Sequence, residues 1–378
     1  MKTNLKVLLT ICCLGQLMAF ASCKKNSVTI DNEEETVVSK TTPTSVTFKG
    51  VTYNVGDTVY GYKNYIKLVV GDNNAPLILG VPHDGLNTGS PVIPETGDTG
   101  RDLNTKLLAK SIASAFKNDT GMQPWMIINE IGRKRVDPNT YPSDVPSRYT
   151  DPEAVNTYNS YHELLLFART TVAAGTAGTQ GALFLDIHGH AHQYDGSHTE
   201  QYTSTTTGNT LQSAFIDQTE VGYGLSNFSL EKDNTYLNAL ADSSSIRNIA
   251  LAHPSTSFSQ LIRGTYSFGA LLEGQSVHAV PGNIMQILER NATLFGTVSG
   301  KPDRRPYFNG GYCTRKYGTI NKGSTTGFND NIAAIQIETP GITVRNNASI
   351  IAISGPRIKK AVINYLNYWY GYTFTNTY

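Results

Sequence analysis

Short, mainly apolar runs, spaced far apart along the chain, constrain the fold more than any other feature of this sequence. They lie at residues 66–70, 76–81, 125–128, 182–187 and 333–337. Such a run is typical of a strand that is buried on both faces of a sheet. Segments with helical spacing of apolar residues lie between or after them, at residues 102–116, 152–174 and 356–370. Pro356 suits the first turn of the last of these helices. Alternating strands and helices predict an α/β fold, with a mostly parallel or mixed central sheet and helices on both faces.

The amino terminus predicts export and lipid anchoring. Lys2 and Lys6 precede an apolar stretch at residues 7–21, which is too short for a membrane-spanning helix and resembles a secretory signal. Small residues directly before Cys23 resemble the bacterial lipobox, in which the signal is removed and the cysteine is lipidated. We therefore expect a signal peptide at 1–22, a lipidated Cys23 with a polar tether at 23–45, and one domain at 46–378. The lipid would be the protein's only contact with a membrane of the cell envelope.

Charge and cysteine content exclude several classes of protein. The formal net charge is +1, and the mature chain has no long run of lysine and arginine, with Lys24 and Lys25 adjacent at its start, so nucleic acid is not an expected partner. After signal removal and lipidation, Cys313 is the remaining thiol, and no internal disulfide can form. The chain also lacks the GxSxG, HExxH, GxGxxG and GxxxxGK[ST] patterns, which disfavours serine hydrolases of that type, zincins and nucleotide binding.

Two of the predicted strands are followed by histidine, which predicts a metal site. His83 follows the run LILGVP, and His188 follows ALFLDI. Ligands of open α/β sheets bind at the carboxyl ends of strands, and a catalytic zinc takes three protein ligands. We prefer His188 to His190 and His192 of the same HGHAH tract, because it lies closest to the strand. Asp186 could then orient an imidazole, or merely cap the following turn.

The third metal ligand and the catalytic base should be carboxylates. Asp102 is the first candidate for the ligand, followed by Glu95 and Asp98, although Asp102 also fits a helix N-cap. Glu338 ends the predicted strand IAAIQIE and could act as the general base, or could be an ordinary salt-bridged residue.

Arginine residues are the candidates for binding negative charge. The segment Arg133-Lys134-Arg135 follows a predicted strand, and Arg315 lies in the segment YFNGGYCTRKYG. Either region could clamp a substrate carboxylate or stabilise a tetrahedral oxyanion, although surface charge is the commoner role of a single arginine.

The order of seven short motifs resembles the N-formylglutamate amidohydrolase family, relatives of the zinc carboxypeptidases and aspartoacylase. The segment RKRVDPN resembles the family's Arg-x-Val-Val-Asp-x-Asn-Arg pattern, and the resemblance runs from about Leu77 to Val344. The other motifs, in order along the chain, are VPHDG, RDLNTKLLAKSIA, SYHELL, LFLDIHGH, YFNGGYCTRKYG and AAIQIETPGITVR.

This resemblance implies a phosphorylase/hydrolase-like fold that holds one zinc ion per chain. His83, His188 and an acidic residue would be the ligands, with Asp102 as our choice, and Glu338 would be the base. It also implies that Arg135, Asp137, Asn139 and Arg315 belong to the pocket. We assign Arg135 a catalytic role and the other three substrate binding.

The departures from the family pattern widen the expected substrate class. Thr140 stands where the pattern has arginine, the chain carries an export signal, and residues 192–283 form a long segment with no assigned role. We expect zinc-dependent hydrolysis of an amide bond in an N-acyl, N-formylglutamate-like amino acid or a small peptide. The alternatives are a carboxypeptidase-like peptidase and a surface binding lipoprotein without activity.

Overall fold

The computed structural model describes residues 45–97, 100–190, 201–203, 210–212, 218–230, 232–286, 297–298, 301–302, 308–323 and 325–374. The chain divides into two compact units, Met1–Glu35 and Thr36–Tyr378, and every described residue belongs to the second. The predicted signal peptide, Cys23 and nearly all of the tether lie outside the described residues.

An eight-stranded sheet organises this unit, with the strand order β11-β10-β14-β7-β5-β6-β4-β3. Its strands, in chain order, are β3 (Thr58–Tyr60), β4 (Ile66–Val69), β5 (Leu77–Val81), β6 (Trp125–Asn129), β7 (Ala182–His190), β10 (Thr219–Gly222), β11 (Ala279–Val280) and β14 (Ile332–Pro340). Three two-stranded sheets accompany it, formed by β1 (Val46–Phe48) with β2 (Val51–Tyr53), β8 (Gln201–Thr203) with β9 (Thr210–Gln212), and β12 (Thr297–Val298) with β13 (Lys301–Pro302).

The centre of the main sheet is parallel and its flanks are mixed. Strands β14, β7, β5 and β6 are parallel neighbours, while β10 is antiparallel to β14, and β4 is antiparallel to both β6 and β3. The carboxyl ends of the four central strands therefore lie at one edge of the sheet. The predicted α/β class with a mixed central sheet is confirmed.

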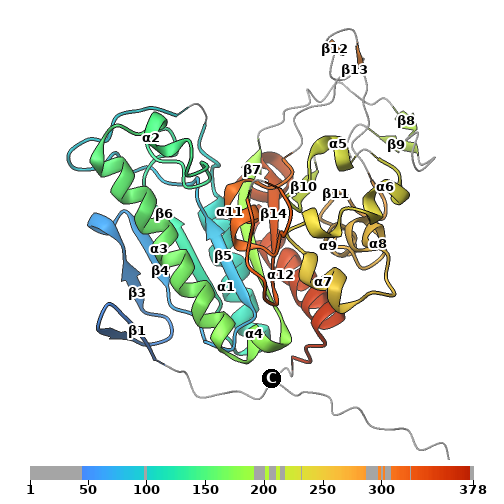
Figure 1. Ribbon diagram of the computed structural model, residues 1–378, viewed down its shortest axis with the longest axis horizontal. Coiled ribbons are helices and arrows are strands. Elements are labelled where there is room, and N and C mark those ends of the chain that lie inside the picture. Colours follow the sequence, from blue (N-terminus) through green and yellow to red (C-terminus); the bar gives the residue numbers. More distant parts are fainter. Residues whose placement is uncertain are drawn as a thin grey trace, which may run out of the picture. The chain divides into compact units, whose positions relative to one another are not determined.

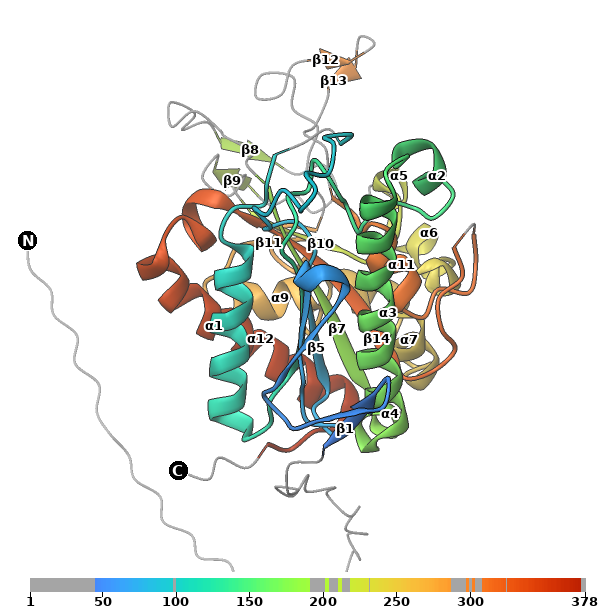
Figure 2. The ribbon, with the colours of Figure 1, turned by 90° about the vertical axis from the view of Figure 1, so that its left-hand side faces the viewer.

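Helices cover both faces of the sheet. Figure 2 shows α1 (Thr105–Thr120) and α12 (Ala348–Tyr370) on one side of β5 and β7, and α3 (Pro152–Ala174) and α11 (Tyr312–Tyr317) on the other. The other helices in the part of the chain that the structure describes are η1 (Tyr62–Asn64), α2 (Val145–Arg148), α4 (Thr176–Gln180), α5 (Asn227–Leu230), α6 (Asn234–Asn238), η3 (Ala241–Ser243), α7 (Arg247–Ala252), α8 (Phe258–Arg263), α9 (Phe268–Glu273) and the π-helical turn η4 (Gly341–Arg345).

Side-chain alternation along the central strands divides the core into two layers. Leu183, Leu185 and Ile187 of β7 join the core cluster under α1 and α12, whereas Ala182 and Phe184 join the cluster under α3. Both faces of the strand are thus apolar, which explains why its sequence reads as a nearly continuous hydrophobic run.

The α3 face of two central strands changes from apolar to polar toward the carboxyl end. On β7 the residues of this face are Ala182, Phe184, Asp186 and His188, and on β14 they are Ile332, Ala334, Gln336 and Glu338. The two strands pair in register, so that Glu338 lies beside His188 and Gln336 lies beside Asp186. All four polar side chains are almost fully buried. A polar group at this depth is costly unless it is bonded, so these four side chains need polar partners at this end of the layer.

Much of the segment at residues 192–283, to which the sequence assigned no role, adds strands to the main sheet and helices that pack beside it. The described part of residues 192–283 contributes β10 and β11 to the sheet and the helices α5 to α9, which Figure 1 shows on the side of β14 away from β5. Leu237, Ile249, Phe268 and Leu272 of these helices join the same core as α1 and α12.

The carboxyl-terminal helix begins earlier than its sequence indicated. Helix α12 starts at Ala348, where the Asn347 side chain accepts a hydrogen bond from the Ile350 N–H, and it includes Pro356 in its interior. The prediction that Pro356 would open the helix is therefore wrong. Pro356 and Ala352 are exposed, so the carbonyl that loses its N–H partner to the proline can bond water instead. Among the described residues, no helix is both long and apolar enough to span a bilayer.

Candidate metal centre

His83 is fixed at the carboxyl end of β5 by two carboxylates. It follows the strand by two residues, and its side chain is fully buried. Its Nε2 lies 2.7 Å from Oδ1 of Asp137, and its Nδ1 lies 3.2 Å from Oδ2 of Asp102. The Asp102 N–H also donates to the His83 carbonyl, which holds the two residues together through the backbone.

His188 approaches the same point from β7. Its Nδ1 lies 3.0 Å from Nδ1 of His83 and 3.3 Å from Oδ2 of Asp102. Its Nε2 lies 3.2 Å from Oδ2 of Asp186, within contact distance but outside hydrogen-bond geometry. Asp186 is held in turn by the Thr314 hydroxyl of α11, which donates to the same oxygen.

The donor atoms of His83, Asp102 and His188 form a set that suits a cation. One ligand atom from each residue lies within 4.8 Å of the others, and all three residues are buried. When each imidazole carries its hydrogen on the Nε2 that faces a carboxylate, both Nδ1 lone pairs converge with a carboxylate oxygen. Such a group repels itself unless a cation or a proton lies among the three atoms. The carboxylates behind the two Nε2 atoms match the arrangement in which metal-ligating histidines are oriented by an acidic partner.

Asp102 is held as a charged group and does not cap helix α1. Its Oδ2 accepts the Gly189 N–H at 3.1 Å, and its Oδ1 lies 3.2 Å from Nη1 of Arg133. Burial favours a higher pKa for Asp102, but the neighbouring His83 and His188 outweigh burial and hold that pKa well below its usual range. Asp84 occupies the capping role instead, because its carboxylate accepts the Lys106 N–H in the first turn of α1.

Arg133 ties two of these carboxylates together. Its Nε lies 3.2 Å from Oδ2 of Asp137, and its Nη1 lies 3.2 Å from Oδ1 of Asp102. Its side chain keeps 25% exposure, while both carboxylates are buried. Burial would raise the pKa of Asp137, but His83 and Arg133 hold that pKa well below its usual range.

Glu338 lies beside the cluster without joining it. Its Oε1 is 3.8 Å from Nδ1 of His188 and accepts a hydrogen bond from the Gln336 side chain at 3.2 Å. Gln336 is itself held by the Gly311 N–H at the start of α11. Burial raises the pKa of Glu338 above its usual range, even though His188 acts in the opposite direction.

The structure places Arg133, rather than Arg135, against the cluster. The guanidinium of Arg135 contacts the Ile93 carbonyl and lies 3.1 Å from the exposed carboxylate of Glu95. The available signal was spacing: Arg133 precedes Asp137 by four residues, as the arginine precedes the aspartate in the Arg-x-Val-Val-Asp pattern. Arg135 occupies a position where that pattern has valine.

The other pocket residues predicted from sequence lie around the cluster in different roles. Asn139 donates its backbone N–H to Asp137, and its side-chain oxygen accepts the Cys313 N–H of α11. Arg315, on the same helix, donates to the Gly224 carbonyl. Its neighbour Thr314 is the residue that contacts Asp186. No contact of Arg315 with the cluster is present among the described residues.

The alternative metal ligands separate clearly where the structure describes them. His190 lies farther along β7, and its Nε2 is 2.8 Å from the Gln218 carbonyl. Glu95 is bound to Arg135 at the surface. His192 and Asp98 lie outside the described residues.

His162, from the Tyr-His pair of the family-like motifs, supports the site from helix α3. Its Nε2 is 3.0 Å from the Pro138 carbonyl, and its Nδ1 is 3.0 Å from the Tyr317 hydroxyl. Burial lowers the pKa of His162 to about 4, so the ring is neutral at pH 7 and donates to the carbonyl next to Asp137. Sequence reasoning assigned it no role.

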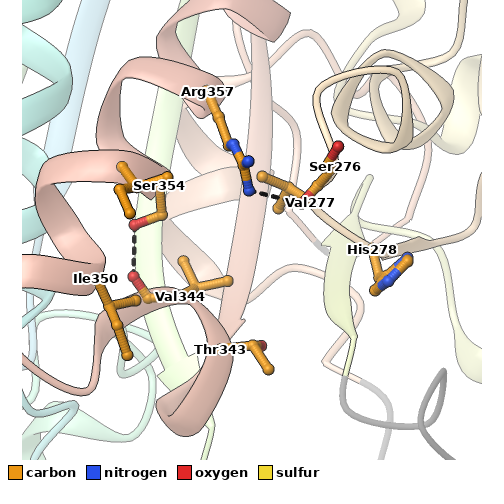
Figure 3. Close-up of a pocket in the computed structure, with 9 residues that line it drawn as sticks. Ser276, Val277, His278, Thr343, Val344, Ile350, Ser354 and Arg357 are labelled. Atoms are coloured by element: carbon orange, nitrogen blue, oxygen red, sulfur yellow. Dashed lines mark hydrogen bonds between the residues drawn. The ribbon is translucent and has the colours of Figure 1, made fainter.

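A cavity of about 180 Å³ lies beside the turn that follows Glu338 (Figure 3). None of its lining residues belongs to the cluster. They are Ser276, Val277, His278, Thr343, Val344, Ile350, Ile353, Ser354 and Arg357.

Comparison with known proteins gives a distant likeness to a solved structure. No family model matches the chain, and no curated protein matches it. Among solved structures, the chain is similar to N-formylglutamate amidohydrolase from Ralstonia eutropha JMP134, with 12% identity, a TM-score of 0.42, and coverage of 80% of this chain and 97% of that chain. A likeness at this level assigns no activity, so the chemistry has to come from the site itself.

The buried, neutral His162 predicts a pH dependence of stability. Its folded pKa of about 4 lies below the unfolded value near 6.5, so the unfolded chain binds a proton first as the pH falls. Its stabilisation is complete above pH 6.5 and is lost progressively toward pH 4. Relative to His162→Gln, the wild type should lose at most about 3 kcal/mol of unfolding free energy across this window.

Urea unfolding of both proteins between pH 4 and pH 8 measures this difference. The difference in unfolding free energy between the two proteins at pH 8 reports the lost hydrogen bonds and packing alone, and it serves as the internal control. A difference that stays constant over the whole range would contradict a neutral, buried His162.

Proposed function

We propose that this protein is a zinc-dependent hydrolase of amide bonds. The convergence of His83 Nδ1, His188 Nδ1 and Asp102 Oδ2 carries the proposal. Two imidazoles and one carboxylate are a common ligand set of catalytic zinc, and three protein ligands leave a position for water or substrate. When bound, zinc supplies Lewis acidity and lowers the pKa of water.

Glu338 is the residue we assign as general base. It lies beside His188 on the neighbouring strand, and Gln336 fixes its carboxylate. From there it can take a proton from the attacking water and return it to the nitrogen of the leaving group. Asp137 and Asp186 keep the imidazoles oriented during this exchange.

Arg133 is the residue we assign to negative charge that develops on the substrate. Two of its N–H groups contact Asp102 and Asp137, which fixes the guanidinium plane, and its part-exposed side chain leaves other donors for a ligand. A fixed guanidinium can hold an oxyanion or a substrate carboxylate without rearranging during the reaction.

The substrate class we propose is an N-acyl amino acid or a small peptide. A carboxypeptidase-like activity would use the same residues, and hydrolysis rates of peptides against N-acyl amino acids would separate the two. A surface binding lipoprotein without activity is the alternative from another class, and it would bind a peptide or glycan and release it unchanged.

One test of this proposal concerns the metal. Elemental analysis of the purified chain should find about one zinc per chain, and His188→Ala should remove it because the variant loses a ligand. Glu338→Gln should keep the zinc and lower kcat by about 10²–10⁴-fold. His190→Ala, a change on the same strand, is the matched control and should keep both metal and activity. If the wild-type chain contains no metal even after zinc is supplied, the proposed zinc-dependent mechanism is wrong.

Another test separates the roles of the two neighbouring arginines, Arg133 and Arg135. Arg133→Ala should lower kcat/KM by about 10²-fold or more, because the developing charge loses a fixed donor. Arg135→Ala should leave kcat/KM close to the wild-type value, since Arg135 is bound to Glu95. Zinc content is measured in parallel, because Arg133 also contacts Asp102. Equal losses in both variants would argue against the placement of Arg133.

Export and lipid anchoring form a separate proposal that rests on the sequence alone. We infer that Cys23 is lipidated and holds the protein on a membrane of the cell envelope. In a bacterial host, the wild type should fractionate with membranes, and Cys23→Ala should shift to the soluble fraction. Unchanged membrane association of the variant would contradict lipidation at Cys23.

A further inference from the structure

Arg345 donates to three backbone carbonyls behind the metal centre. It is the last residue of the turn η4, and its side chain is 5% exposed. Its Nε donates to the Thr339 carbonyl at 3.0 Å, its Nη2 to the His190 carbonyl at 2.6 Å, and its Nη1 to the Leu103 carbonyl.

These three carbonyls belong to three of the segments that carry the site. Leu103 follows Asp102 directly, Thr339 follows Glu338 directly, and His190 lies two residues beyond His188. One guanidinium therefore connects the loop before α1 with the ends of β7 and β14. Segments that are far apart in the sequence are held in one arrangement.

Gly189 provides the space in which Arg345 lies. A Cβ atom at this position would approach Nε of Arg345 to 2.1 Å and Cζ to 2.2 Å. Since residues alternate along β7, Gly189 faces the side opposite to His188, and Arg345 supports the strand from behind the site. The Gly189 N–H donates to Asp102, so the same residue touches both the support and a ligand.

The turn that carries Arg345 is itself anchored at its carboxyl-terminal end. The Asn104 side chain donates to the Arg345 carbonyl at 2.9 Å and to the Asn346 carbonyl at 3.0 Å. The Ser354 hydroxyl of α12 donates to the Val344 carbonyl, as Figure 3 shows. The guanidinium thus extends from a backbone that is held by hydrogen bonds within the protein and needs no metal for its position.

We propose that Arg345 is a positioning residue of the metal centre, which sets the spacing of Asp102, His188 and Glu338 from the opposite face of the sheet. The proposal rests on the zinc site proposed above, and concerns how this chain builds it. The planar guanidinium presents several donors in a rigid fork, which a lysine ammonium cannot reproduce. Charge alone is therefore not sufficient for the role.

Zinc affinity of the full chain provides the first test. Competition with a chromophoric chelator should show that Arg345→Lys binds zinc about 10–100-fold more weakly than the wild type, the usual cost of losing a partner behind the ligands. Arg263→Lys is the matched control. Arg263 lies in helix α8, away from the site, and like Arg345 it is buried and donates to a backbone carbonyl, that of Lys232. The control should bind zinc as the wild type does.

Amide hydrogen exchange on the metal-free chain provides a readout that does not depend on zinc. Arg345→Lys should raise exchange together in residues 102–104, 188–190 and 338–339, because all three segments lose one support. Arg263→Lys should leave these segments unchanged. If zinc does not bind the wild type, the proposed function fails, and the exchange pattern still decides the role of Arg345.

Gly189→Ala supplies an independent perturbation of the same contact. Its methyl group should displace the guanidinium and weaken zinc binding as Arg345→Lys does. The double variant should bind no more weakly than the weaker single variant, because both changes remove one interaction. Zinc affinity and exchange in Arg345→Lys that match Arg263→Lys would overturn the proposal and leave Arg345 with an ordinary packing role.

Discussion

Two histidine nitrogens that face each other at 3.0 Å across a buried carboxylate impose the constraint on which this structure depends. When both rings carry their hydrogen on Nε2, the two Nδ1 lone pairs repel at that distance, and burial removes the water that would screen them. The fold has to hold them together without their help. It does so through the carboxylates of Asp137 and Asp186 on the far sides of the two rings, and through parallel strands whose carboxyl ends meet at one edge of the sheet. The proposed zinc ion would then meet ligands that are already oriented.

Two arginines, Arg133 and Arg345, contact the segments that carry this centre from opposite faces of the sheet. Arg133 faces the site from the loop after β6 and balances two carboxylates, while Arg345 lies on the opposite face and donates to backbone carbonyls of three segments. One contributes electrostatically and remains within reach of a ligand. The other acts through the geometry of the strands. A single sheet separates the two tasks.

The sequence could predict the sheet and the two histidines because both depend on local patterns. Burial on both faces leaves a hydrophobic run, and His83 and His188 stand at the ends of two such runs. It could not predict that Glu338 and His188 lie side by side, since strand register depends on long-range pairing. Arg345 was beyond reach as well, because its partners are backbone carbonyls that any residue could supply. Pro356 misled because a solvent-facing position tolerates a proline inside a helix.

The polar residues of β7 and β14 occur at every second position, and this has a consequence for how the gene can change. A one-residue insertion or deletion in either strand would turn its whole polar row toward the apolar layer under α1 and α12. Asp186 and His188 would be misplaced together, as would Gln336 and Glu338. A point substitution changes one of these residues at a time, whereas a single insertion or deletion within either strand displaces all of its polar residues at once. Natural variation in length should therefore be confined to the loops beyond them.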